Sequence, residues 1–132
     1  MKQLNYQTLQ DLNYDGYLLN EAPERVLQFG EGNFMRAFVD FFIDKMNETA
    51  NFNSKVVLVQ PIPKFTTPDV GDFINEQEGL YTLYLRGSEN GQEVSSKRVI
   101  SCISRCLNAY SDYEAVMECA KNPELRFIAC NT

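Results

Sequence analysis

Two short, uninterrupted apolar runs separated by a glycine turn and a helical pattern constrain the fold of this chain more than any other feature. The first run, Arg25–Phe29, ends at Gly30. The second, Lys55–Gln60, contains four consecutive aliphatic residues and is terminated by Pro61. Continuous apolar strands are typical of parallel sheets that are covered on both faces. Strand, helix and strand in this order therefore predict a βαβ unit.

The segment between the two runs has the periodicity of a helix that begins near Asn33. Its apolar residues recur at helical spacing and cover so much of the helix surface that we expect the helix to be largely buried. These residues are Phe34, Met35, Phe38, Val39, Phe41, Phe42, Ile43 and Met46.

The second half of the chain predicts further strands and one helix. Residues Leu80–Arg86 and Glu93–Ser104 are strand-like, and the Asn-Gly pair between them favours a hairpin turn. Ser111–Glu114 has the form of a capping box, so we expect a helix from there until an Asn-Pro pair stops it. Leu125–Cys130 is a third candidate strand for the parallel sheet.

Together these elements predict an α/β fold, with a Rossmann-like parallel sheet, helices on both faces and an inserted β-hairpin. A chain of 132 residues is long enough for one domain, which we expect to span residues 1–132. Residues Phe65–Glu78 lack a clear period and are expected to be irregular. The chain ends at Thr132, directly after the third strand, whereas a doubly wound nucleotide fold has two βαβαβ halves. We therefore expect a fold that is truncated after its first half.

Composition excludes several classes of function. The net charge of −6 opposes general attraction to nucleic acid or to an anionic membrane. No stretch approaches the roughly 18 apolar residues of a membrane span, so we expect a cytoplasmic protein. The chain contains no histidine, which removes Ser-His and Cys-His nucleophiles and makes a metal site unexpected. The four cysteines are expected to be small buried residues: Cys102, Cys106, Cys119 and Cys130.

The turn Gly30-Glu31-Gly32 lies between a predicted strand and a predicted helix, which is where nucleotide-binding folds hold a pyrophosphate. The first glycine permits a tight turn, and the second lets the backbone approach the ligand. The N–H groups and the positive dipole end of the helix then face the phosphates. Met35 occupies the third place of the G-x-G-x-x-G pattern, so an ordinary strand-to-helix turn remains the alternative.

Two further residues are candidates with open alternatives. Arg36, in the first turn of the helix, either contacts a phosphate or carboxylate of the ligand or pairs with Glu31 or Asp40. Gln60, at the end of the second strand, either bonds the adenosine ribose or is a solvated strand-end residue. Because the amide of Gln60 does not repel a 2′-phosphate as a carboxylate would, this residue does not distinguish NAD from NADP as the cofactor.

Several blocks of sequence, in order, resemble one known family. They are Glu24–Asp40, Val59–Ile62, Glu78–Leu83 with Arg86-Gly87, and Asn122–Phe127 leading to Asn131-Thr132. In these blocks the chain resembles the mannitol dehydrogenase family of long-chain polyol and sugar-acid dehydrogenases, and within it the members that act on tagaturonate. The likeness covers most of the chain after residue 23.

The resemblance implies an NAD-linked reduction of the ketone of tagaturonate to altronate, in hexuronate breakdown. It also implies a Rossmann-type domain followed by a mostly helical domain, which supplies a catalytic lysine and nearby Asn and His that bind the sugar-acid substrate. We therefore expect no catalytic residue and no metal in this chain, and no turnover by the chain alone. The family's role in cofactor binding carries over to Gly30, Glu31, Gly32, Asn33 and Phe34, and less directly to Asn131 and Thr132.

A second class of function stays open, namely a non-catalytic nucleotide-binding or interaction module with the same half-fold. A reading frame that continues into a helical domain with those catalytic groups would favour the dehydrogenase. Sheet edges and apolar surface left uncovered would favour self-association of the chain.

Overall fold

The structure, a computed structural model, describes residues 1–131. The helices are α1 (Tyr6–Asp11), α2 (Asn33–Ala37), α3 (Val39–Ala50), α4 (Val70–Glu76) and α5 (Tyr113–Cys119). The strands are β1 (Glu24–Phe29), β2 (Lys55–Gln60), β3 (Tyr81–Glu89), β4 (Gln92–Ile100), β5 (Ile103–Asn108) and β6 (Phe127–Cys130). Within the described part of the chain, no helix is long and apolar enough to cross a membrane.

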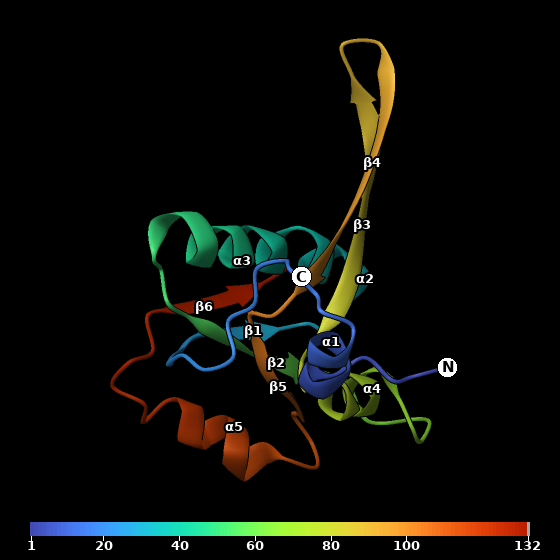
Figure 1. Ribbon diagram of the computed structural model, residues 1–132. Coiled ribbons are helices and arrows are strands. Elements are labelled where there is room, and N and C mark those ends of the chain that lie inside the picture. Colours follow the sequence, from blue (N-terminus) through green and yellow to red (C-terminus); the bar gives the residue numbers. More distant parts are fainter. Residues whose placement is uncertain (132) are drawn as a thin grey trace.

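A four-stranded parallel sheet organises the molecule (Figure 1), with the strand order β5-β2-β1-β6. Strand β1 pairs in parallel with both β2 and β6, so that Leu27 lies between Val57 and Ile128. The prediction that these three strands are parallel neighbours is confirmed. The Rossmann-like fold class is confirmed as well.

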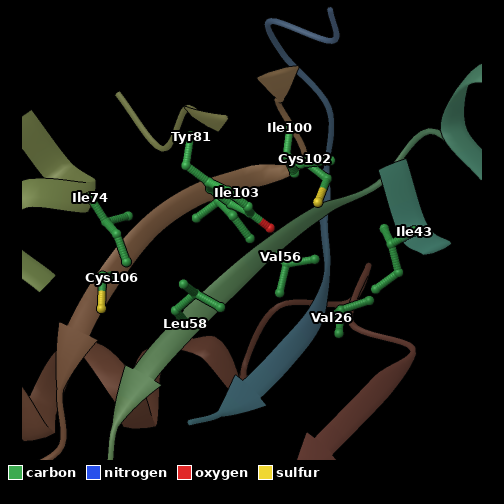
Figure 2. Packing of buried hydrophobic residues seen from close by; sticks show 10 residues of the cluster. All are labelled: Val26, Ile43, Val56, Leu58, Ile74, Tyr81, Ile100, Cys102, Ile103 and Cys106. Atoms are coloured by element: carbon green, nitrogen blue, oxygen red, sulfur yellow. The ribbon is translucent and has the colours of Figure 1, made fainter. Parts of the chain in front are cut away.

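Side chains of the central strands alternate between two apolar layers because successive residues of a strand point to opposite faces. On one face Val56 and Leu58 pack with Ile43 of α3 and Ile74 of α4, as Figure 2 shows. On the other face Val57 and Val59 pack with Val116 of α5. Helices therefore cover both faces of the sheet, which explains why β2 is apolar without interruption.

The expected single strand Glu93–Ser104 is wrong, because the chain bends between β4 and β5. At the bend the Ser101 amide donates to Asp44 Oδ1 (2.9 Å) and the Cys102 thiol contacts the Asp40 carbonyl oxygen (3.2 Å). Strand β5 then joins the parallel sheet beside β2, while β3 and β4 form a separate antiparallel hairpin that projects away from the sheet (Figure 1).

Two expectations about helix starts are also wrong. Residues Phe65–Glu78 contain α4, whose first turn is closed by a reciprocal capping box between Asp69 and Asp72. The expected capping box at Ser111 does not form, because α5 begins after Asp112 and the Ser111 amide donates to Asn108 Oδ1 instead (3.3 Å).

The helix after the glycine turn differs from its prediction in continuity and in burial. It breaks at Phe38 into α2 and α3. Phe34 is 62% exposed, and its ring stacks on that of Phe38, which in turn contacts Phe42. The side facing the sheet instead includes buried polar residues, among them Asp40 and Asp44. The helix presents only one side to the sheet, so part of its aromatic stripe faces outward.

The cysteines follow the prediction except at the last position. Cys102, Cys106 and Cys119 are buried, whereas Cys130 on β6 is exposed. Strand β6 lies at the edge of the sheet, where Phe127 and Ile128 are exposed too.

Candidate functional site

The carboxyl ends of the parallel strands bring most of the candidate residues to one edge of the sheet. Strand β1 leads into Gly30, β2 ends at Gln60 and β6 leads into Asn131. The Gly30 amide donates to the Val59 carbonyl oxygen (2.9 Å), which ties the glycine turn to the neighbouring strand. In open α/β sheets this edge is where ligands bind.

The two glycines of the turn are required for different reasons. Gly30 has φ +118°, a conformation that L side chains rarely adopt. A Cβ at this position would also lie 3.3 Å from Asn131 Oδ1, so the side chain of Asn131 reaches the turn. Gly32 has an ordinary φ of −69°, and a Cβ there would meet no atom within 4 Å. The space over Gly32 is open to a ligand.

Gly32 is also the N-cap residue of α2 and has no side chain to close the helix start. The first N–H groups of the helix are therefore available to an anion. Asn33 and Phe34 follow in the first turn, with their side chains exposed beside the opening. Glu31 is half-buried between the two glycines. Thr132 lies outside the described residues.

Arg36, on α2, stabilises the glycine turn through hydrogen bonds. Its Nε donates to the Glu31 carbonyl oxygen (2.8 Å), and Nη2 donates to Asn33 Oδ1 (2.7 Å). The guanidinium also lies over the ring of Tyr81, 5.4 Å from its centre. Of the two alternatives for Arg36, pairing with the carboxylate of Glu31 or Asp40 is not what the structure has, because the guanidinium bonds to the Glu31 backbone and to the Asn33 amide. Contact of Arg36 with a ligand stays a prediction.

Gln60 is not a solvated strand-end residue, since only 7% of its surface is exposed. Its Nε2 donates to Asp69 Oδ2 (3.2 Å), and its Oε1 lies over Gly71. Asp69 in turn lies 3.8 Å from the ammonium group of Lys64. Sequence reasoning had missed Asp69, because the helix that it caps was not predicted.

A polar pair beneath the turn was also missed. Gln28 and Asp40 are fully buried, and Gln28 Nε2 donates both to Asp40 Oδ2 and to the Gly30 carbonyl oxygen (3.0 Å each). Burial raises the pKa of Asp40 to about 7, although the bond from Gln28 and the charge of Arg36 lower it. A glutamine inside an otherwise apolar strand was the signal that could have indicated this pair.

The arrangement can hold an anionic ligand, but the two buried thiols near it are not reactive nucleophiles. Burial raises the pKa of the Cys106 thiol to about 12 and that of Cys102 well above its ordinary value, so both thiols stay protonated at neutral pH. Lys55 is buried at the opposite ends of the strands, where its ammonium group donates to the Leu19 carbonyl oxygen (2.5 Å).

Known proteins with similar sequences are sugar-acid oxidoreductases. An altronate oxidoreductase of Phocaeicola vulgatus is 48% identical over 121 residues, which is 92% of this chain and 24% of that protein. One from Bacillus subtilis is 45% identical over 127 residues, 94% of this chain and 25% of that protein. The chain therefore spans about a quarter of the length of the curated relatives that it matches.

Solved structures show the same fold. Mannitol 2-dehydrogenase of Pseudomonas fluorescens, in a ternary complex with NAD and D-mannitol, superposes with a TM-score of 0.76 at 26% identity and covers 98% of this chain, or 26% of that one. A substrate-free D-sorbitol dehydrogenase superposes with a TM-score of 0.79 at 22% identity, covering 97% of this chain and 26% of that one. Residues 24–130 match the mannitol dehydrogenase Rossmann domain, and the chain belongs to that family.

Proposed function

We propose that this chain is the NAD-binding part of an oxidoreductase, with the pyrophosphate seated against the turn Gly30-Glu31-Gly32. The observation that carries the proposal is the open space over Gly32 at an uncapped helix start. A backbone without Cβ and unpaired N–H groups are what a pyrophosphate needs. The NAD in the complex of the related mannitol 2-dehydrogenase supports the choice of ligand.

The remaining contacts of the cofactor are proposed from their places at the same edge. Asn33 and Phe34 border the phosphate position, and Asn131 closes the turn on the side of β6. Gln60 lies at the ribose position, together with the carboxylate of Asp69 that it contacts. Arg36 acts by holding the turn, since its guanidinium bonds to Glu31 and Asn33.

For the whole protein we propose the interconversion of tagaturonate and altronate with NADH and NAD. The names of relatives at 45–48% identity support this reaction. Hydride transfer needs a positioned proton donor beside the substrate carbonyl, and the chain has no histidine. We propose that the catalytic groups belong to a part of the protein other than these 132 residues.

Calorimetric titration with NADH tests the cofactor site. Gly32→Val places a branched side chain in the open space and should abolish binding while the protein stays folded. Gly87→Val is the matched control, since a Cβ at Gly87, in the hairpin, also meets no atom within 4 Å. Unchanged NADH affinity in folded Gly32→Val protein would show that the cofactor does not lie against this turn.

The catalytic proposal is tested by following NADH oxidation with tagaturonate. We expect no turnover by the 132-residue chain and turnover by a protein that also contains the helical domain of the family. Turnover by the chain alone would refute the proposed division of labour. NADH binding without turnover in any longer form of the protein would favour a nucleotide-binding module.

A further inference from the structure

Gln28 on β1 and Asp40 on α3 leave two buried oxygens without partners. Both side chains are fully buried, and one hydrogen bond joins Gln28 Nε2 to Asp40 Oδ2 (3.0 Å). Within the described part of the chain, Gln28 Oε1 and Asp40 Oδ1 have no hydrogen-bond partner. A buried polar atom that lacks a partner costs stability.

Turning the Gln28 amide over does not give the two oxygens partners. As placed, Nε2 donates to two acceptors, Asp40 Oδ2 and the Gly30 carbonyl oxygen. If the amide were turned over, Oε1 would face both of these acceptors and neither bond could form. A hydrogen on the carboxyl group would supply the missing donor.

One proton on Asp40 would give both oxygens a partner. A planar amide and a planar carboxylic acid can pair through two bonds, in which the amide N–H donates to one carboxyl oxygen and the acid O–H donates to the amide oxygen. The first bond is present between Nε2 and Oδ2. The second would join Oδ1 to Oε1, the two atoms that lack partners. A carboxylate could only accept, and both oxygens would stay unsatisfied.

The surroundings of Asp40 favour its neutral form. Arg36 on α2 is the charged group that faces it, but the guanidinium is bonded to Glu31 and Asn33. Tyr81 of β3 and Cys102 of the β4–β5 bend also face the carboxyl group, and burial raises the pKa of both, so they remain uncharged. Asp44 on α3, the other nearby acid, is neutralised by its ion pair with Arg98 (2.7 Å).

We propose that Asp40 and Gln28 hold one proton as a cyclic acid–amide pair, and that this pair positions the Gly30 carbonyl and thereby the glycine turn. Loss of the proton would leave two acceptors facing each other and would weaken the hold of Gln28 on Gly30. Cofactor binding at the turn then declines as the proton leaves. This last step rests on the proposed function, whereas the shared proton does not.

The substitution Asp40→Asn tests the proton directly, because asparagine presents an acceptor oxygen and an N–H donor in the same plane at every pH. The pKa of Asp40 is about 7 in the folded protein against 3.8 ordinarily. The stability due to the proton is therefore complete below pH 3.8 and is lost as the pH rises through 7. Relative to Asp40→Asn, the unfolding constant of the unsubstituted protein should rise roughly 100-fold between pH 5 and pH 8.

Asp44→Asn is the matched control, since Asp44 is equally buried on the same helix but pairs with Arg98. It should lose stability at every pH in this range. A ratio of unfolding constants between the protein and Asp40→Asn that does not change with pH would overturn the proposal. Should Asp40→Asn fail to fold, infrared spectroscopy with ¹³C-labelled aspartate decides: a protonated carboxyl band at pH 5.5 supports the shared proton, and its absence refutes it.

NADH titration separates the two parts of the inference. We expect the affinity of the unsubstituted protein to fall about 10-fold from pH 6 to pH 8, and that of Asp40→Asn to change much less. NADH binding with equal pH dependence in both would refute the positioning role. Absence of NADH binding in both, with the stability difference intact, would refute the proposed function and leave the proton in place.

Discussion

Gly30→Ala should destabilise the protein, whereas Gly32→Ala, two residues later in the same turn, should not. At Gly30 the backbone has φ +118°, and holding a residue with a Cβ there costs about 1–3 kcal/mol. The contact with Asn131 Oδ1 at 3.3 Å adds little, because that side chain is exposed and can move. Alanine also restricts the unfolded chain, which stabilises the folded state by about 0.4–1 kcal/mol. The net loss should be about 1–2 kcal/mol.

At Gly32 the same reasoning gives a different result. The φ of −69° suits any residue, and a Cβ would meet no atom within 4 Å. Alanine is a poorer N-cap residue than glycine, but it also restricts the unfolded chain, which favours the folded state by about 0.4–1 kcal/mol. The two effects oppose each other, so the free energy of unfolding should stay within about 0.5 kcal/mol of its original value.

Urea unfolding followed by circular dichroism measures both variants. The dependence of the unfolding free energy on urea concentration should be the same for both variants and for the unsubstituted protein. A shift of the unfolding midpoint then reports a change in stability alone. Equal midpoints for Gly30→Ala and Gly32→Ala would refute the assignment of conformational strain to the first glycine. A large loss in Gly32→Ala would show that the space over Gly32 is not open.

Three further predictions concern the parts of the fold that hold the site, and urea unfolding measures each. Leu58→Ala, in the fully buried centre of β2, should cost about 2–5 kcal/mol because it leaves a cavity between the sheet and its helices; a loss below 1 kcal/mol would contradict this packing. Asp44→Ala should cost roughly 3 kcal/mol, because it leaves Arg98 and the Ser101 amide without their buried partner; Glu48→Ala, which removes the exposed partner of Arg98, should cost less than about 1 kcal/mol. Asp69→Ala should cost about 1 kcal/mol through loss of the α4 cap, and a neutral result would argue against that cap.

The sequence could predict the features that depend on neighbours along the chain. The run Lys55–Gln60 is apolar at successive positions because both faces of its strand are covered, and that pattern indicates a parallel sheet before any partner strand is known. Gly30 and Gly32 mark a turn because glycine alone readily adopts the positive φ of Gly30 and leaves the space over Gly32 free of a Cβ. Both conclusions follow from local stereochemistry.

Local sequence patterns did not predict where two of the helices begin. Ser111–Glu114 has the residue types of a capping box, whereas Asp69 and Asp72 depart from the usual types. The capping box nevertheless forms between Asp69 and Asp72 and not at Ser111. The Ser111 amide is bonded by Asn108, which β5 places beside it when that strand pairs with β2. The side chain of Asn108, three residues before Ser111, thus decided which of the two local patterns closed a helix.

Only the tertiary structure decided which side of a helix faces the sheet and which distant residues meet. The aromatic stripe beginning at Phe34 predicted burial, but its rings stack on one another at the surface while Asp40 and Asp44 turn inward. Asp40 meets Gln28 because α3 crosses back over β1, and periodicity does not indicate which polar side chain will find a buried partner. The sequence by itself determined the strand–glycine turn–helix unit, since short-range sterics specify it; the contacts that hold the turn depend on long-range packing.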